Sequence, residues 1–306
     1  MTTILFVKTS SLGDVVHNCP AVSDAARALP GVAIDWIVEE PFAGIAAMHG
    51  AVRRVIPVAI RRWRAGLWKP EVWAEIGAWR REVRRSRYDA VIDTQSLLKS
   101  ALVSALARGR RHGMDWSSSR EPLAAAFYQV RHAVPRELHA VERNRRLTAS
   151  ALGFSLQSSI DYGIRIPEAE KSGYVVLLTM TSRADKLWPE ERWIELGRGL
   201  RAPAILPWGS EAERARAQRI AHEIGATTLP EPLPFDELAR LFAAARSVVG
   251  LDTGLTHLAA ALGVPTVGIY CGSDPVLTGL YGAPHAKNVG GPGRLPGADE
   301  VLRLLA

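Results

Sequence analysis

Three loops in the sequence carry groups that could do chemistry, and each loop follows a short apolar run. The first loop has the sequence KTSSLGD and spans Lys8 to Asp14, with Gly13 allowing close approach of the backbone. A carboxylate such as Asp14 at the end of a strand can take a proton from an incoming hydroxyl group. Aspartate is also favoured at helix N-termini, so a purely capping role for Asp14 is the alternative.

The second loop, residues 179–189, has the sequence TMTSRADKLWP and precedes an expected helix. It carries the hydroxyl groups of Thr181 and Ser182 and the cations of Arg183 and Lys186. Hydroxyls, cations and the free N–H groups of a helix start can together hold a diphosphate. An ordinary polar surface loop before a capped helix is the alternative interpretation.

The third loop, residues 250–258, has the sequence GLDTGLTHL and again lies between an expected strand and an expected helix. Thr253, Gly254 and Leu255 would offer backbone amides at the helix start. His257 lies four residues after Thr253 and would face the same side of the helix. The sequence therefore predicts a binding site here, with a buried core histidine as the alternative.

Several familiar motifs are absent from the sequence. Neither G-x-G-x-x-G nor G-x-x-x-x-G-K-[ST] occurs, which removes the main support for nicotinamide-dependent and ATPase functions. There is no D-x-D pair, no H-E-x-x-H and no cluster of cysteine and histidine. We therefore expect no metal and no cofactor, so that protein cations and helix dipoles would stabilise a departing diphosphate.

The elements that must position these loops alternate along the chain. Apolar runs predict strands at Ile4–Val7, 34–38 and 90–92, and helices are expected at 15–29, 71–87 and 99–107. After Pro167 the pattern repeats, with strands expected at 174–178, 204–206, 247–250 and 265–270 and helices at 188–200, 211–224, 235–245 and 255–262.

This alternation predicts an α/β fold of two Rossmann-like domains that face a cleft. We expect an N-terminal domain over residues 1–165 and a C-terminal domain over residues 166–306, joined near residues 156–173. It stays open whether the last helix packs back on the first domain. In such sheets ligands bind at the carboxyl ends of the strands, which is where all three loops are expected.

Composition and charge narrow the class of protein. With 47% hydrophobic and 23% charged residues, the chain resembles soluble globular proteins, and Cys19 and Cys271 are expected to be free thiols in a reducing cytosol. Neither a signal peptide nor an apolar run of about 20 residues occurs, which favours a cytoplasmic location.

The net charge of +7 is unevenly divided. Residues 1–165 carry a balance of +9 and residues 166–306 one of −2. The first half could therefore meet an anionic partner, a plain basic surface being the alternative. A non-catalytic polyanion-binding protein is a distant second possibility, although no nucleic-acid module is recognisable.

The segments KTSSLGD, ADKLWPEERW, LPWG and DTGLTHL, in this order, resemble the ADP-heptose:lipopolysaccharide heptosyltransferases of the inner core. VEEPFA, VIPVAIRRWR, YDAVIDTQSLLKSA, HGMDWSSSREPLA and HAVER resemble the branch that adds the first heptose, and the resemblance runs from Ile4 to about Tyr281. It implies a GT-B fold and an inverting, metal-independent transfer from ADP-L-glycero-β-D-manno-heptose. The acceptor would be the inner 3-deoxy-D-manno-octulosonic acid (Kdo) of Kdo2-lipid A, at the cytoplasmic face of the inner membrane. A related enzyme that adds a later heptose is the alternative.

The resemblance also implies roles for individual residues. Asp14 would be the general base, and Pro232 stands where the family has a methionine beside the adenine, which puts that contact in question. The implied donor-binding residues are Thr181, Ser182, Lys186, Glu213, Asp252, Thr253, Gly254 and His257. The implied acceptor-binding residues are Ser10, Ser11, Gly13, Arg61, Arg62, Arg64, Arg120, His139 and Arg143.

Four tryptophans, Trp63, Trp68, Trp73 and Trp79, lie close together in the basic half. Tryptophan is favoured at membrane interfaces because its ring is apolar and its N–H is polar. Basic residues near an anionic leaflet contribute about 1 kcal/mol each, so we expect salt-sensitive, peripheral membrane association. Ordinary core packing is the alternative, above all for Trp73 and Trp79.

Overall fold

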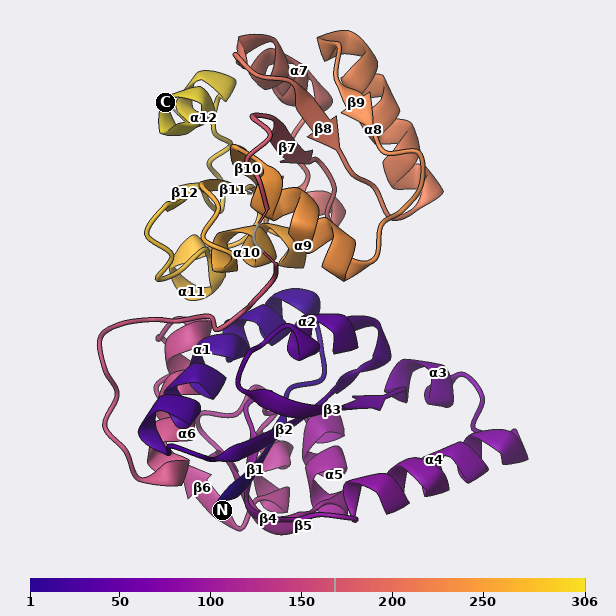
Figure 1. The fold of residues 1–306 in the computed structure, drawn as a ribbon, viewed down its shortest axis with the longest axis vertical. Coiled ribbons are helices and arrows are strands. Elements are labelled where there is room, and N and C mark those ends of the chain that lie inside the picture. Colours follow the sequence, from indigo (N-terminus) through magenta and orange to yellow (C-terminus); the bar gives the residue numbers. More distant parts are fainter. Residues whose placement is uncertain (168, 306) are drawn as a thin grey trace. The chain divides into compact units, whose positions relative to one another are not determined.

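The computed structural model describes residues 1–167 and 169–305 and divides the chain into two α/β units, Met1–Gly163 and Ile164–Ala306 (Figure 1). Each unit holds a six-stranded sheet in which all strand pairs are parallel. The expected fold class, two Rossmann-like domains, is confirmed. No helix within the described ranges is long and apolar enough to cross a membrane.

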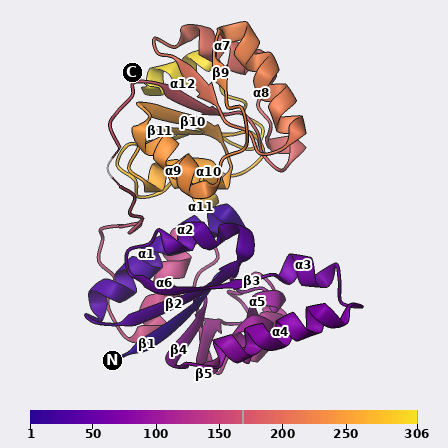
Figure 2. The same ribbon diagram turned by 45° about the vertical axis from the view of Figure 1, so that its right-hand side comes forward.

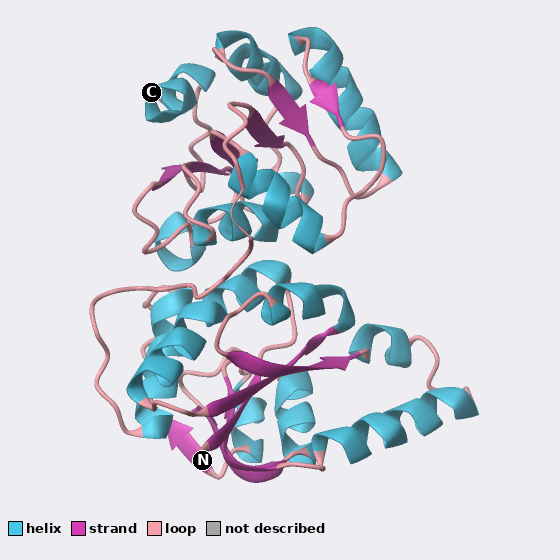
Figure 3. Cartoon of the chain, in the orientation of Figure 1, coloured by secondary structure: helices cyan, strands magenta, loops and turns pink. Residues whose placement is uncertain are grey.

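The first unit alternates strands and helices, as Figure 3 shows by colour. Its strands are β1 (Thr3–Val7), β2 (Ala33–Glu39), β3 (Val52–Val58), β4 (Arg87–Asp93), β5 (Arg108–Met114) and β6 (Val130–His132). Its helices are α1 (Leu12–Ala28), α2 (Ala43–Ala47), α3 (Ile60–Arg64), α4 (Pro70–Val83), α5 (Leu98–Leu106) and α6 (Ala140–Leu152). Short 3-10 turns at Glu40–Phe42 and Pro122–Phe127 complete it.

Side chains of β1 alternate between the two faces of this sheet. On one face, Leu5 and Val7 belong to a buried cluster with Trp63, Trp79 and Val103. Helices α3, α4 and α5, which carry these three residues, cover this face. On the other side α1 packs against α6 and α2. A strand that is covered on both faces must be apolar throughout, which explains the continuous run Ile4–Val7.

The second unit repeats the same plan. Its strands are β7 (Val175–Leu178), β8 (Ala204–Leu206), β9 (Thr227–Thr228), β10 (Ser247–Leu251), β11 (Thr266–Tyr270) and β12 (Ala286–Gly290). Its helices are α7 (Glu190–Gly199), α8 (Glu211–Ile224), α9 (Phe235–Ala244), α10 (Gly254–Ala261), α11 (Pro275–Thr278) and α12 (Ala298–Leu305), and a 3-10 turn spans Ala184–Lys186. The last helix, α12, packs on α7, β11 and β12 of its own unit.

Local sequence signals explain where the helices begin and end. Ser210 precedes α8 and accepts a hydrogen bond from the Glu213 N–H at 3.4 Å, as an N-cap does. Gly225 ends the helix in the left-handed conformation with φ of 66°, which glycine adopts without strain. The expected helix over residues 211–224 has these same bounds.

The sequence did not predict strand β5, and one helix is shorter than expected. The sequence of β5, RGRRHGM, has few residues that favour strands, yet it pairs with β4 and β6 inside the sheet. Its Gly113 is required because a Cβ there would collide with the ring of Tyr128. The expected helix over residues 71–87 ends at Val83, and Arg87 already belongs to β4.

Candidate functional site

The strand order places the three candidate loops at the switch points of the two sheets. The first sheet has the order β3-β2-β1-β4-β5-β6 and the second the order β12-β11-β10-β7-β8-β9, so both follow the Rossmann arrangement. The order reverses between β1 and β4 and between β7 and β10. The loops that follow these four strands therefore lie at the switch points, where ligands bind in such sheets.

Asp14 lies in the first turn of α1, just after β1. Its Oδ2 accepts a hydrogen bond from the Ser11 N–H at 3.2 Å, so Asp14 does help to cap the helix. The same carboxylate also lies 3.8 Å from the Lys8 ammonium and 3.3 Å from Arg120 Nη1. Its side chain is 23% exposed. Capping a helix does not require cations beside the carboxylate. The two cations and the partial exposure of Asp14 therefore suit a chemical role in addition to the cap.

The two cations keep Asp14 ionised. Burial raises the pKa of its carboxyl group, but the charges of Lys8 and Arg120 outweigh burial and hold the pKa below its usual range. Lys8 itself is buried, and its ammonium donates to the Thr94 carbonyl at 3.0 Å. Burial lowers the pKa of Lys8, and the charge of Asp14 opposes that shift. Asp14 is thus an ionised carboxylate with one exposed cation and one buried cation beside it.

Gln95, a residue that the sequence did not single out, joins the loop after β4 to the loop of Asp14. Its Oε1 accepts hydrogen bonds from Thr9 N at 2.6 Å, from Thr9 Oγ1 at 2.9 Å and from Ser10 N at 3.2 Å. Its Nε2 donates to the Ser10 carbonyl. The side chain is 1% exposed. A buried amide with these bonds fixes the path of the chain that leads to Asp14.

Asp93, the last residue of β4, holds the loop that carries Gln95. One carboxylate oxygen accepts from the Gln95 N–H at 2.9 Å, and the other accepts from the Tyr128 hydroxyl at 2.8 Å. Burial raises the pKa of Asp93. The only signal in the sequence was an acidic residue at the end of an apolar strand, which says nothing about the partners it would find.

The predicted acceptor-side residues fall into two groups. Close to Asp14 lie Arg120 and Ser10, whose Oγ accepts from the Lys99 ammonium at 2.7 Å. Arg143 supports the segment that carries Arg120, since its Nη2 donates to the Ser118 carbonyl at 2.5 Å. His139 caps α6, and its ring packs edge-on against His17 at 5.5 Å.

The arginines of α3 are less directly connected to Asp14. The Arg61 N–H donates to Glu39 Oε1 at 2.8 Å, and its guanidinium lies over the ring of Phe42. Arg62 is paired with Glu40 and Glu75. Arg64 is exposed. Burial lowers the pKa of the Lys99 ammonium. The charge of Glu39 opposes this shift, and the charge of Arg61 adds to it.

In the second unit, Asp252 is the centre of a polar cluster. Its Oδ2 accepts from the Lys186 ammonium at 2.5 Å and from the Ser273 hydroxyl at 2.5 Å, and His257 Nε2 lies 3.5 Å from its Oδ1. The loops after β7, β10 and β11 therefore meet at one carboxylate. Burial raises its pKa, but the bonds from His257, Lys186 and Ser273 prevail and hold it well below the usual range.

Apart from Glu213, the other residues predicted for the donor side lie on the same loops. Thr253 caps α10, and its hydroxyl lies 3.2 Å from that of Thr256, while Gly254 is the first residue of the helix. Thr181 Oγ1 is 3.5 Å from the Asp252 carbonyl, and Ser182 is exposed. The Thr179 hydroxyl is buried without a hydrogen-bond partner among the described residues.

Glu213 lies at the start of α8, apart from these loops in the sequence. Its Oε2 accepts from the Gly209 N–H at 2.7 Å, which ties it to the end of the LPWG segment. The indole N–H of Trp208 donates to the Leu229 carbonyl at 2.7 Å, and Arg214 stacks over the Trp208 ring. Pro232 is exposed. In residues 1–167 and 169–305, no group of three or more His, Cys, Asp or Glu side chains could hold a metal ion.

Comparison with known proteins gives consistent matches over most of the chain. The family model of glycosyltransferase family 9 (heptosyltransferase) matches residues 76–295. Lipopolysaccharide heptosyltransferase 1 of Salmonella typhimurium is 48% identical, over 91% of this chain and 91% of that protein. The E. coli heptosyltransferase WaaC solved with ADP has a TM-score of 0.91 and 44% identity, over 99% of each chain. The same enzyme with ADP-2-deoxy-2-fluoro heptose has a TM-score of 0.89 and 43% identity, again over 99% of each chain.

Proposed function

The chain belongs to glycosyltransferase family 9, the heptosyltransferases, and we propose that it moves L-glycero-D-manno-heptose from ADP-heptose to the inner Kdo of Kdo2-lipid A. The identity of nearly one half to a lipopolysaccharide heptosyltransferase 1 supports this step over a later one. Similar structures with ADP and with an ADP-heptose analogue support the nucleotide-heptose as the donor.

The observation that carries the catalytic part of the proposal is the setting of Asp14. A general base must be ionised before it can accept a proton, and the cations at Lys8 and Arg120 keep this carboxylate ionised. A low pKa also makes it a weak base, so positioning must supply much of the rate. Arg120 is 49% exposed and its two contacts to Asp14 are both 3.3 Å long. An acceptor carboxylate that binds Arg120 would weaken this pairing and make Asp14 more basic.

In the proposed reaction the acceptor hydroxyl gives its proton to Asp14 as its oxygen attacks the anomeric carbon. The bond from that carbon to the ADP oxygen breaks, and ADP departs with the electron pair and a developing negative charge. Attack from the face opposite the leaving group inverts the anomeric configuration. The bond-breaking state resembles an oxocarbenium ion, and the departing charge needs stabilisation.

The cluster around Asp252 is suited to that second task. Lys186 supplies a cation, and Thr253, Gly254 and Leu255 supply backbone amides at the N-terminus of α10. Asp252 accepts from Lys186 and faces His257, so both side chains are held in fixed directions. With Thr181 and Ser182 these groups would bind the diphosphate and heptose, and Glu213 would bind the ribose. In this proposal the protein groups take the place of a metal ion, so the transfer is metal-independent.

The acceptor side would use Ser10, Ser11 and Gly13 of the Asp14 loop together with the basic residues Arg61, Arg62, Arg64, Arg120, His139 and Arg143. Kdo carries a carboxylate and lipid A carries phosphates, which arginine binds with paired hydrogen bonds. Because lipid A is anchored in a bilayer, we place the enzyme peripherally on the cytoplasmic face of the inner membrane.

The proposal is tested by incubating the protein with ADP-heptose and Kdo2-lipid A in EDTA. We expect stoichiometric release of ADP, a product heavier by one heptose, and an inverted anomeric configuration by NMR. An acceptor that already bears the first heptose should not be extended. Transfer to that acceptor alone would favour the later-heptose enzyme, and loss of activity in EDTA would contradict the metal-independent mechanism.

A further inference from the structure

Helices α3 and α4 form a hairpin that projects from the sheet of the first unit, with residues 65–69 at its far end (Figures 1 and 2). Three large apolar side chains are exposed at this end: Trp68 is 76% exposed, Trp73 is 58% exposed and Leu67 is 46% exposed. Exposed apolar residues that gather in this way mark a surface that meets another molecule or a membrane.

The hairpin is held in place, so its exposed end is not a frayed segment. Trp63 on α3 and Trp79 on α4 are buried and their rings pack edge-on at 5.8 Å. At the end of the hairpin the Trp73 indole N–H donates to the Leu67 carbonyl at 2.7 Å. Trp63 and Trp79 therefore anchor the hairpin in the core, whereas Trp68 and Trp73 are exposed. The core-packing alternative, expected above all for Trp73 and Trp79, is right for Trp79 and wrong for Trp73.

The hairpin also concentrates positive charge. Residues 60–85, which end just after α4, contain eight Lys and Arg against three Asp and Glu, a balance of +5 in a chain of net +7. Two of the acids, Glu75 and Glu82, are engaged in ion pairs with arginines. Among the described residues no ion pair forms at five exposed cations of the hairpin, Arg64, Lys69, Arg80, Arg81 and Arg84.

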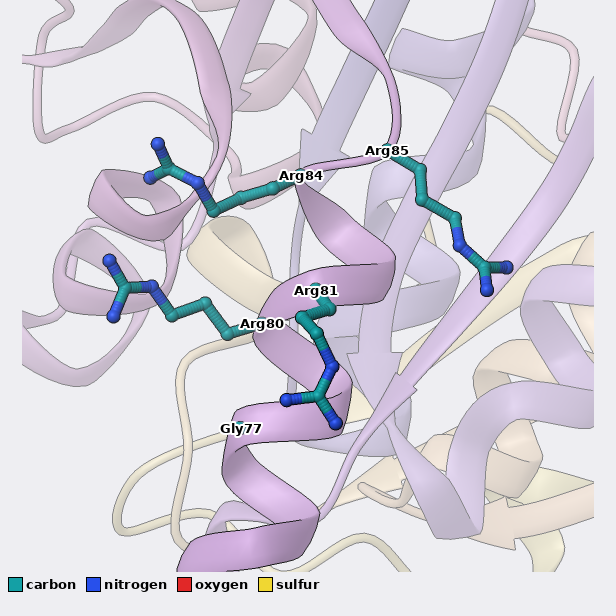
Figure 4. Close-up of a pocket in the computed structure, with 5 residues that line it drawn as sticks. All are labelled: Gly77, Arg80, Arg81, Arg84 and Arg85. Atoms are coloured by element: carbon teal, nitrogen blue, oxygen red, sulfur yellow. The ribbon is translucent and has the colours of Figure 1, made fainter.

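The arginines at the end of α4 do not converge on one point. Arg80, Arg81, Arg84 and Arg85 line a shallow hollow with Gly77, but Arg80 and Arg84 extend to one side of the helix and Arg85 to the other (Figure 4). A site for one anion would direct its cations inward. Cations that spread along a helix instead suit a surface whose negative charges are themselves spread out.

We infer that the α3–α4 hairpin docks the enzyme on an anionic lipid bilayer, with Leu67, Trp68 and Trp73 entering the interface. The cations that face the lipid phosphates are Lys69, Arg80, Arg81 and Arg84. Tryptophan suits the boundary because its ring is apolar and its N–H is polar. This inference rests on the proposed function, since it names the surface by which the enzyme reaches a membrane-anchored acceptor. It needs no glycolipid acceptor in the bilayer.

The experiment measures flotation of the full-length protein with vesicles of phosphatidylcholine containing 30% phosphatidylglycerol, without any lipid A. We expect binding that weakens with salt and is lost on pure phosphatidylcholine. Replacing the two tip residues, L67S with W68S, and separately R80Q with R81Q and R84Q, should each weaken binding at least about ten-fold. Matched controls in the second unit are Leu295→Ser, at an exposed leucine, and the triple change R201Q, K287Q and R303Q, which removes the same charge.

Heptosyl transfer to a soluble Kdo disaccharide without lipid separates this inference from the proposed function. Both hairpin variants should keep that activity, which also shows that they fold. Wild-type protein that transfers heptose to the soluble acceptor but does not float would overturn the inference and leave the function standing. Variants that float like wild type would overturn it too. The exposed hairpin tip could instead contact a second copy of the chain, which sedimentation velocity tests. A dimer of the wild-type protein that W68S abolishes, together with no flotation, would also contradict the lipid assignment.

Discussion

The Lys186 ammonium lies 2.5 Å from Asp252 Oδ2, and this ion pair joins the loop after β7 to the loop after β10 at the switch point of the second sheet. Asp252 is 9% exposed and Lys186 is 18% exposed, so water screens the pair only partly. The pairing fixes the one cation of this loop that the proposal assigns to the diphosphate. If the proposal is right, the pair links the stability of the second unit to donor binding.

Replacing Asp252 with Asn should destabilise the protein by about 2 kcal/mol at pH 7, because Lys186 would be left partly buried without its partner. The pKa of Asp252 is depressed in the folded protein, so its contribution is present above the ordinary aspartate pKa and is lost as pH falls through the folded value. The difference between wild type and D252N should therefore shrink in acid. Urea unfolding at several pH values measures this difference, with Asp236→Asn, at an exposed position of α9, as the control. A gap that widens below pH of about 4 would contradict this account.

Replacing Lys186 with Ala should weaken ADP binding by roughly ten-fold to a hundred-fold, since a charge-assisted contact to the diphosphate is removed. Isothermal titration with ADP measures the effect. Arg192→Ala is a suitable control because Arg192 is an exposed cation paired with Glu195 on α7. Unchanged ADP affinity in the Lys186 variant would remove Lys186 from the diphosphate site.

Gln95→Leu should lower kcat by about a hundred-fold while ADP-heptose affinity stays close to wild type. The amide of Gln95 fixes the backbone at Thr9 and Ser10, and displacement of the catalytic group by about 1 Å can cost that much. Steady-state kinetics and donor titration separate the two quantities, and Gln218→Leu, at an exposed position of α8, is the control. A loss of donor affinity with normal kcat would show that Gln95 does not act through the Asp14 loop.

Arg120→Gln should move the acid limb of the pH–rate profile to higher pH. Burial raises the pKa of Asp14 and the charges of Lys8 and Arg120 lower it, so removing Arg120 lets the pKa rise. The profile of kcat/KM from pH 4 to 8 tests the shift at saturating ADP-heptose. An acid limb that stays in place or moves lower would mean that Asp14 is not the group titrated.

The sequence was enough to predict the two-domain α/β plan, because continuous apolar strands such as Ile4–Val7 and capped helices such as Glu211–Ile224 are local signals. The strand β5 was missed because its arginines and glycines are tolerated only through partners far away in the chain, above all Tyr128.

The same limit applies to the candidate site. The three loops could be predicted, since each carries its polar residues at the end of a strand. The contacts among them could not, because Gln95 meets Thr9, and Lys186 meets Asp252, only through the order of strands in the sheet. Asp14 accepts a hydrogen bond from the Ser11 N–H at the helix start, so the capping role is present. Its carboxylate also lies beside the cations of Lys8 and Arg120, and its role as the base stays a prediction.

The most direct test of the central claim is heptosyl transfer by Asp14→Asn, a change that keeps the size of the side chain and removes its charge. We predict that ADP release in the presence of ADP-heptose and Kdo2-lipid A falls at least about a thousand-fold. The affinity for ADP-heptose should stay within a few-fold of wild type, because the residues proposed to bind the donor, such as Lys186 and Asp252, do not include Asp14. Turnover within ten-fold of wild type would contradict the assignment of Asp14 as the base.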